Sequence, residues 1–343
     1  MKRALGSLVL GCMAAGVAVG LMLGVLAVMG YPAGAVAREW ATGAAGTWED
    51  FATSLKEACP LLLTGLAAGV AFRCGVLNIG AEGQFLLGGI TAIGMTTRFA
   101  PPGLPAWMGI VIACGVGMLA GAIWAGVAAV LERYRGVPLV LSTILLNFVA
   151  LYVLRVLVTG ILQAPGRGAH SLEVPEKLQL PILLEGTDLH VGVIVAGVVA
   201  VAVWVVMART RFGFELLLTG QNARAAELAG VRVRRRAVEV MLLSGAIAGL
   251  GGSLQALGVT HGLTDDPASF GYAGIAVALL GRLHPLGIVL AAMFFGMLER
   301  GASFAEPTVP HHVADVIKGV VILVTLGATA WVVGRTKGAV RGG

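Results

Sequence analysis

Charged and aromatic residues are scarce in this sequence. Only 12% of its 343 residues are charged and only 6% are aromatic, whereas 57% are hydrophobic. A soluble domain carries about 25% charged residues, so this chain lacks the charge that a water-facing surface requires. Its mean hydropathy is +0.90, and many of its 51 glycines lie inside apolar runs, as in closely packed membrane helices. The composition predicts an all-α, integral membrane protein.

Sequence patterns of catalysis are also missing. The chain has no GxxxxGKS/T phosphate loop, no HExxH pair and no CxxC pair, so nothing predicts ATP hydrolysis, a metal site or a bound cofactor. Ser244 stands before a glycine, as in a membrane serine protease, but no histidine base accompanies it. We therefore expect no catalytic residue, no enzyme activity and a helix-packing role for Ser244.

Ten apolar runs are candidates for membrane spans, since a bilayer core requires about 20 apolar residues per helix. Three or four of them are short, which favours broken or re-entrant helices buried among others. The first run is longer than the apolar core of a signal peptide, so we expect it to be retained. The ten runs are residues 6–29, 57–73, 78–97, 104–131, 137–160, 190–208, 238–258, 271–281, 286–299 and 312–333.

The charges between these runs predict an orientation and a single transmembrane domain over residues 1–343. Seven arginines lie in residues 209–237, and the carboxy-terminal segment is also basic, whereas residues 161–189 carry more acidic than basic side chains. Basic loops face the cytoplasm, so both termini and loop 209–237 are expected there, with loop 161–189 outside. The formal net charge of +6 then reflects membrane flanks, and no nucleic-acid partner is expected.

Two segments predict an inverted five-plus-five repeat. Residues 62–69 and 242–249 share the pattern Leu-Leu-Thr/Ser-Gly followed by Ala-Gly, and the two spans would run in opposite directions. Chance is a strong alternative because Leu, Ala and Gly are common here. Three GxxxG pairs, at residues 65/69, 117/121 and 245/249, indicate close helix packing and no particular function.

Polar residues inside apolar runs are candidates for the path of a solute. Asn78, Glu82 and Gln84 straddle the break between the second and third runs, and they either line that path or bind backbone amides that the break frees. Asn147 and Thr143 lie in the fifth run with the same two alternatives. Nearby rings could stack on a flat heterocycle, or serve only in packing; they are Phe72, Phe85 and Phe148.

A short helix is predicted within the basic loop. Asn222 can cap it, the alanine-rich residues 223–229 favour it, and Gly230 can end it. Such an exposed helix suits the docking of a soluble partner, although a plain basic connector is the alternative. The residues assigned to coupling are Gly220, Gln221, Asn222, Ala223, Arg224, Ala225, Ala226, Glu227 and Leu228.

Several separated motifs resemble permease subunits of ABC importers, closest to the nucleoside type within the group that includes simple-sugar and branched-chain amino-acid permeases. The resemblance covers roughly residues 55–330. Its motifs are residues 60–66, 72–84, 220–230, 243–250 and 274–287. Two departures concern residues 137–143, where an acidic or amide residue usually precedes Ser-Thr, and Leu218, where a basic residue is more usual.

The resemblance implies a multi-pass protein of the bacterial plasma membrane that works by alternating access. Its partners would be cytoplasmic ATPase subunits that bind ATP and Mg²⁺, a second permease subunit (identical or different), and an extracytoplasmic solute-binding protein. Purine nucleosides are the expected solutes, with ribose-like sugars or other ribosylated heterocycles as the alternative. An ion-gradient-driven secondary transporter is the alternative of another class, and the scarcity of membrane carboxylates argues against it.

Overall fold

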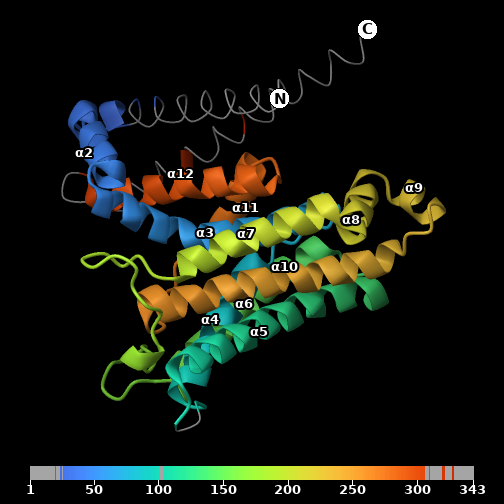
Figure 1. Ribbon diagram of the computed structural model, residues 1–343, viewed down its shortest axis with the longest axis horizontal. Coiled ribbons are helices and arrows are strands. Elements are labelled where there is room, and N and C mark those ends of the chain that lie inside the picture. Colours follow the sequence, from blue (N-terminus) through green and yellow to red (C-terminus); the bar gives the residue numbers. More distant parts are fainter. Residues whose placement is uncertain are drawn as a thin grey trace. The chain divides into compact units, whose positions relative to one another are not determined.

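The computed structural model describes residues 20, 24, 26–100, 103–305, 309, 319–320 and 327. In this part of the chain the regular structure is helical, and strand pairing is limited to three isolated bridges. The helices (Figure 1) are α2 (Ala33–Ala45), α3 (Trp48–Arg73), α4 (Ala81–Thr97), α5 (Ala106–Arg135), α6 (Leu139–Val158), η1 (Glu176–Leu178), α7 (Gly192–Arg209), α8 (Arg211–Gln221), α9 (Ala223–Leu228), α10 (Val233–Gln255), the π-helical turn η2 (Ala256–Thr260), α11 (Phe270–Leu280) and α12 (Pro285–Phe304).

The predicted all-α, polytopic fold is confirmed. Eight of the ten expected runs coincide with helices, and runs 6–29 and 312–333 lie largely outside the described residues. Six of the described helices are long and apolar enough to cross a membrane. Of the short runs, 271–281 corresponds to the 11-residue helix α11, as the sequence predicts. Runs 57–73 and 286–299 belong to longer helices, α3 with 26 residues and α12 with 20, whereas α4 is shorter than its run, with 17 residues. The inverted repeat stays a prediction.

The chain divides into two compact units, with the divisions inside α3 and α12. One unit comprises residues 1–57 and 294–343, and the other comprises residues 58–293. In the first unit, Arg300 donates to the Asp50 carboxylate at 3.0 Å, and Trp40 packs in an apolar cluster with Leu298 and Ala302. The larger unit contains all the residues expected to line the solute path. The assignment of residues 1–343 to one domain stays a prediction.

Glycines allow α4, α5 and α10 to pack with their backbones in close approach. A Cβ atom on Gly121 of α5 would lie 2.9 Å from the Cα of Gly249 of α10, and one on Gly249 would lie 3.1 Å from the Cα of Gly121. Ser253 of α10 donates to the carbonyl of Gly88 in α4 at 3.2 Å. Small residues at such crossings increase van der Waals contact between membrane helices. Two of the three GxxxG pairs therefore mark this packing.

The connection between α6 and α7 is hydrogen-bonded to the segment that follows α10. Ser171 donates its amide to the carbonyl of Leu263 at 2.9 Å, Val174 donates to His261 at 2.8 Å, and Leu180 donates to Leu257 at 2.9 Å. In Figure 1, α10 extends from the end of this unit that carries α8 and α9 to the end that carries this connection. The connection thus forms an ordered cover over the π-helical end of α10.

We expect Gly121→Val to lower the thermal stability of the purified protein in detergent. The added side chain would overlap the backbone of α10, and overpacking costs about 1–3 kcal/mol. Gly115→Val is the matched control, because a Cβ atom on Gly115, also in α5, meets nothing within 4 Å. Equal melting temperatures for the two variants would contradict the close packing of α5 on α10.

Candidate functional site

The break between α3 and α4 is held by the side chain of Asn78. Gly75 turns the chain there with a φ of +77°, a conformation that glycine adopts without strain. The Asn78 amide nitrogen donates to Gln84 Oε1 at 3.0 Å and to Ser244 Oγ at 2.9 Å. Its oxygen accepts from the amide of Gly80 at 2.9 Å and from Gln84 Nε2 at 3.1 Å. An asparagine side chain can form four such bonds, so that of Asn78 is fully used.

Asn147 joins α6 to the same break. Its oxygen accepts from the amide of Gly83 at 2.9 Å, and its nitrogen donates to the carbonyl of Ile79 at 2.9 Å and to the hydroxyl of Tyr272 at 3.1 Å. Ser244 in turn donates to the carbonyl of Ala67 at 2.7 Å. Ser244 therefore links α10 to α3, in agreement with a helix-packing role.

Glu82 links the start of α4 to the start of α11. Its Oε2 atom accepts from the amide of Gly271 at 2.7 Å, and the amide of Tyr272 also bonds this carboxylate. The first N–H groups of a helix have no partner within the helix, and the helix dipole favours a negative charge there. Glu82 thus caps a short buried helix across the fold.

These contacts favour the structural interpretation of the polar cluster over direct binding of a solute. Asn78, Glu82, Gln84 and Asn147 are all buried, and they bond to one another, to freed backbone groups or to Ser244. Thr143 is buried beside them and donates to the carbonyl of Val140 at 3.0 Å. The cluster therefore fixes the helix break that the short spans require.

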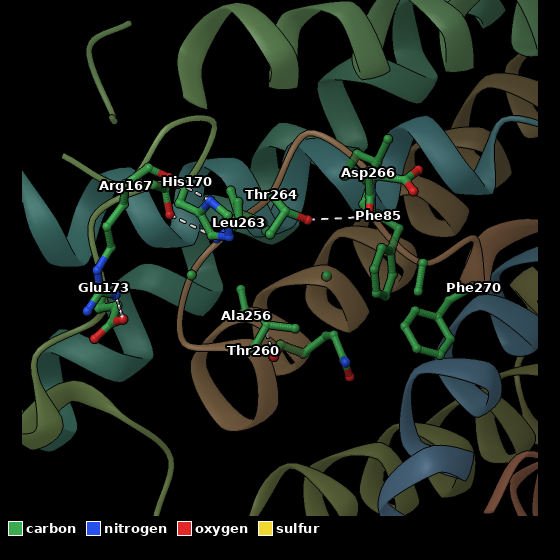
Figure 2. A pocket seen from close by; sticks show the side chains of 18 residues that line it. Phe85, Arg167, His170, Glu173, Ala256, Thr260, Leu263, Thr264, Asp266 and Phe270 are labelled. Atoms are coloured by element: carbon green, nitrogen blue, oxygen red, sulfur yellow. Dashed lines mark hydrogen bonds and ion pairs between the residues drawn. The ribbon is translucent and has the colours of Figure 1, made fainter. Parts of the chain in front are cut away.

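A pocket of about 340 Å³ lies next to this cluster, between α4, the end of α10, loop 161–189 and the segment before α11. Phe85 and Phe270 line one end, and Arg167, His170 and Glu173 line another (Figure 2). Thr264 and Asp266 lie on the segment between His170 and Phe270. The two phenylalanine rings are 5.6 Å apart, with 48° between their planes.

Of the three aromatic candidates, the structure brings only Phe85 to this pocket. Phe72 is half-buried, and Phe148 is 53% exposed on the outer surface of α6; neither lines the pocket. Sequence reasoning missed Phe270 and Gln255. The available signal was the acidic and proline-containing stretch Asp265–Pro267, which directly precedes a short apolar run.

The basic loop contains the predicted short helix and a second helix before it. Asn222 caps α9 by accepting from the amide of Ala225 at 3.0 Å, and Gly230 ends the turn with a φ of +83°. Leu228 is 80% exposed, and Arg224 and Glu227 are exposed beside it. Ala226 differs from expectation, because its side chain is fully buried within this chain.

Ion pairs fasten α8 to the start of α10. Arg236 donates to Glu215 Oε2 at 2.7 Å, and Arg211 donates to Glu215 Oε1 at 2.8 Å. Hydrogen bonds from Arg236 and Arg211, in that order, lower the pKa of Glu215 below its ordinary value. At the other end of α8, Gly220 lies directly against the carbonyl of Arg73. The loop is thus connected to the α3–α4 break.

We expect Glu82→Leu to destabilise the protein strongly and Glu82→Gln to destabilise it less. Leucine leaves two buried N–H groups of α11 without an acceptor, at about 1–3 kcal/mol each, whereas the glutamine oxygen can still accept. Melting temperatures in detergent measure the difference. If both variants melt at the same temperature as the parent, Glu82 does not cap α11. If Glu82→Gln is stable but does not transport, the Glu82 carboxylate has a direct role in transport.

Comparisons with known proteins agree with this architecture. Residues 51–326 match the family model "Branched-chain amino acid transport system / permease component". The chain is 34% identical to the guanosine ABC transporter permease protein NupP of Bacillus subtilis, over 83% of each chain. It is 29% identical to the nucleoside permease protein NupB of Lactococcus lactis, over 81% of this chain and 79% of that one.

A glucose ABC transporter permease protein, TsgB13 of Haloferax volcanii, is also similar. It is 35% identical over 78% of this chain and 74% of its own length. No solved structure matches. Because the family model covers most of the chain and the relatives are matched over most of their lengths, the chain is a membrane-embedded member of the family of permease components of branched-chain amino acid transport systems.

Proposed function

We propose that this chain is the permease subunit of an ATP-driven ABC importer for purine nucleosides. The similarity to a guanosine permease over 83% of both chains carries the proposal, and a second relative is a nucleoside permease. Membership of the permease family implies translocation rather than catalysis. Since no phosphate-loop motif occurs in the sequence, ATP and Mg²⁺ would be bound by partner ATPase subunits.

The exposed surface of α9 is suited to contact those ATPase subunits. Its arginine, glutamate and leucine side chains at residues 224, 227 and 228 face outward. A force on this loop would reach the helix break through the Glu215–Arg236 pair and through the contact of Gly220 with Arg73. ATP-dependent closure of the ATPases would thereby shift the equilibrium between outward- and inward-open states.

The remaining partners follow from the same proposal. A second permease subunit, identical or different, would complete the membrane core, and a solute-binding protein would dock at the end of the larger unit that carries loop 161–189. The charge bias of the loops supports cytoplasmic termini in a bacterial plasma membrane, with residues 209–237 inside.

A simple sugar is the second candidate solute, because the glucose permease relative is 35% identical. Residues 137–143 also depart from the pattern of nucleoside permeases, because no acidic or amide side chain precedes Ser142 and Thr143. This departure favours retaining the sugar as an alternative solute. The two candidates differ in the heterocycle. Uptake of labelled nucleosides and labelled sugars therefore separates them.

Uptake of labelled guanosine, adenosine, ribose and glucose by the native host tests the solute. We expect deletion of this gene to abolish ATP-dependent nucleoside uptake and to leave sugar uptake intact, with restoration by the parent gene. Loss of sugar uptake alone would show that the solute is a sugar and not a nucleoside. If uptake depends on an ion gradient and not on ATP, the chain is not part of an ATP-driven ABC importer.

We expect Leu228→Asp to abolish co-purification of the ATPase and to lower uptake at least tenfold, while membrane levels and melting temperature stay unchanged. Leu228 is 80% exposed, so the charge disturbs a docking surface and not this fold. Leu183→Asp is the matched control, at a 45% exposed leucine in loop 161–189. Normal ATPase binding by Leu228→Asp would show that this surface of α9 does not contact the ATPase.

A further inference from the structure

The pocket beside the polar cluster has two chemically different ends. Phe85 of α4 and Phe270 at the start of α11 line an aromatic end, together with small residues of α10 such as Gly252 and Ala256. The labelled side chains Arg167, His170 and Glu173 lie at a polar end, Thr264 lies between the two ends, and Asp266 lies beside Phe85 (Figure 2). A ligand that fills this pocket would need an apolar planar part and a hydroxyl-rich part.

At the aromatic end, contacts position the ring of Phe85 and the backbone of Phe270. A Cβ atom on Gly251 would lie 3.3 Å from the Phe85 ring, so glycine at that position lets the ring pack against α10. The carbonyl of Phe270 accepts from Thr64 Oγ1 at 3.1 Å, and the next residue, Gly271, is bound by Glu82. Groups positioned in this way lose little freedom when a flat heterocycle stacks on the two rings.

The lining of the pocket offers polar groups that the protein does not use. Within the described part of the chain, no hydrogen bond occupies the side-chain amide of Gln255 or the carboxylate of Asp266, although both residues line the pocket. Arg167 and Glu173, by contrast, pair with each other, and His170 Nδ1 lies 2.9 Å from the carbonyl of Arg167. Asn78 and Gln84 in the nearby cluster bond to each other. The unused amide and carboxylate are therefore the groups that a ligand would meet.

Size and chemistry together point to a ribosylated heterocycle. The volume of about 340 Å³ lies in the lower part of the range of small-molecule sites, about 300–1,000 Å³. Bases stack on aromatic side chains regardless of their identity, and a carboxylate accepts hydrogen bonds from ribose hydroxyls in dinucleotide sites. A simple hexose would leave the apolar end without a planar partner.

We propose that this pocket holds the nucleoside during transport, with the base on Phe85 and Phe270 and the ribose hydroxyls on Gln255 and Asp266. The inference rests on the proposed function and adds the place and the chemistry of recognition. Phe270 is the first residue of α11, next to the Gly271 amide that Glu82 binds, so an occupied pocket lies against the helix break. Onward passage requires the Phe85–Phe270 pair to separate.

A steric block tests the pocket in the complete importer. Ala268 is exposed and lines the pocket, whereas Ser269 is exposed and does not. We expect Ala268→Trp to lower guanosine uptake at least tenfold and Ser269→Trp to change it less than twofold, at equal membrane levels. If both variants take up guanosine equally while the parent transports it normally, the nucleoside does not occupy this pocket. The proposed function would still hold.

Thiol protection measures binding directly in the purified importer. Thr264→Cys places a reactive thiol at the exposed side of the pocket, and Glu185→Cys, exposed but outside it, is the control. After the modification rate of the parent's own cysteines is subtracted, guanosine should slow the modification of Thr264→Cys and not that of Glu185→Cys. Protection by glucose but not guanosine, or no protection by either, would overturn the nucleoside assignment.

Two further variants, measured in the same assay, test the placement of the base and of the ribose separately. Phe270→Leu should raise the half-protecting guanosine concentration about tenfold, the size expected for one stacked base. Asp266→Ala should raise it for guanosine but not for 2′,3′-dideoxyguanosine. The same effect of Asp266→Ala on both ligands would contradict the placement of the ribose, and no effect of Phe270→Leu would contradict that of the base.

Discussion

A broken helix inside a membrane must find partners for the backbone groups that the break exposes, because lipid supplies none. The rest of this structure depends on how that requirement is met between α3 and α4. Asn78 uses all four of its hydrogen bonds there, Asn147 adds three from α6, and Glu82 binds the start of α11. Polar side chains that look like a solute path in the sequence thus connect five helices, α3, α4, α6, α10 and α11.

The same break lies between the two surfaces on which transport would depend. At one end Gly220 of α8 lies against the carbonyl of Arg73, so motion of loop 209–237 would reach the turn at Gly75. At the other end, Phe270 precedes the capped turn of α11 and lines the pocket. A shift of α11 relative to α4 would therefore change the Phe85–Phe270 pair, and two such arrangements would suit a two-state transporter.

The sequence predicted the helices well because membrane spans are set by length and hydropathy, and it predicted α9 because Asn222 and Gly230 are strong local signals. It could not assign partners to Asn78 or Glu82, since Ser244 and Gly271 are more than 160 residues away. Phe148 and Phe85 look alike in sequence, but helix rotation leaves Phe148 53% exposed and buries Phe85. The pocket residues Gln255 and Phe270 meet only through tertiary packing.

We expect this chain to move nucleosides by coupling a helix break to ATP hydrolysis in partner subunits. Purified importer in liposomes, with ATP and Mg²⁺ trapped on the ATPase side and binding protein on the other, tests it most directly. We predict that labelled guanosine accumulates only when ATP is present, and that an imposed proton or sodium gradient has no effect. Accumulation driven by either gradient without ATP would contradict the coupling of transport to ATP hydrolysis.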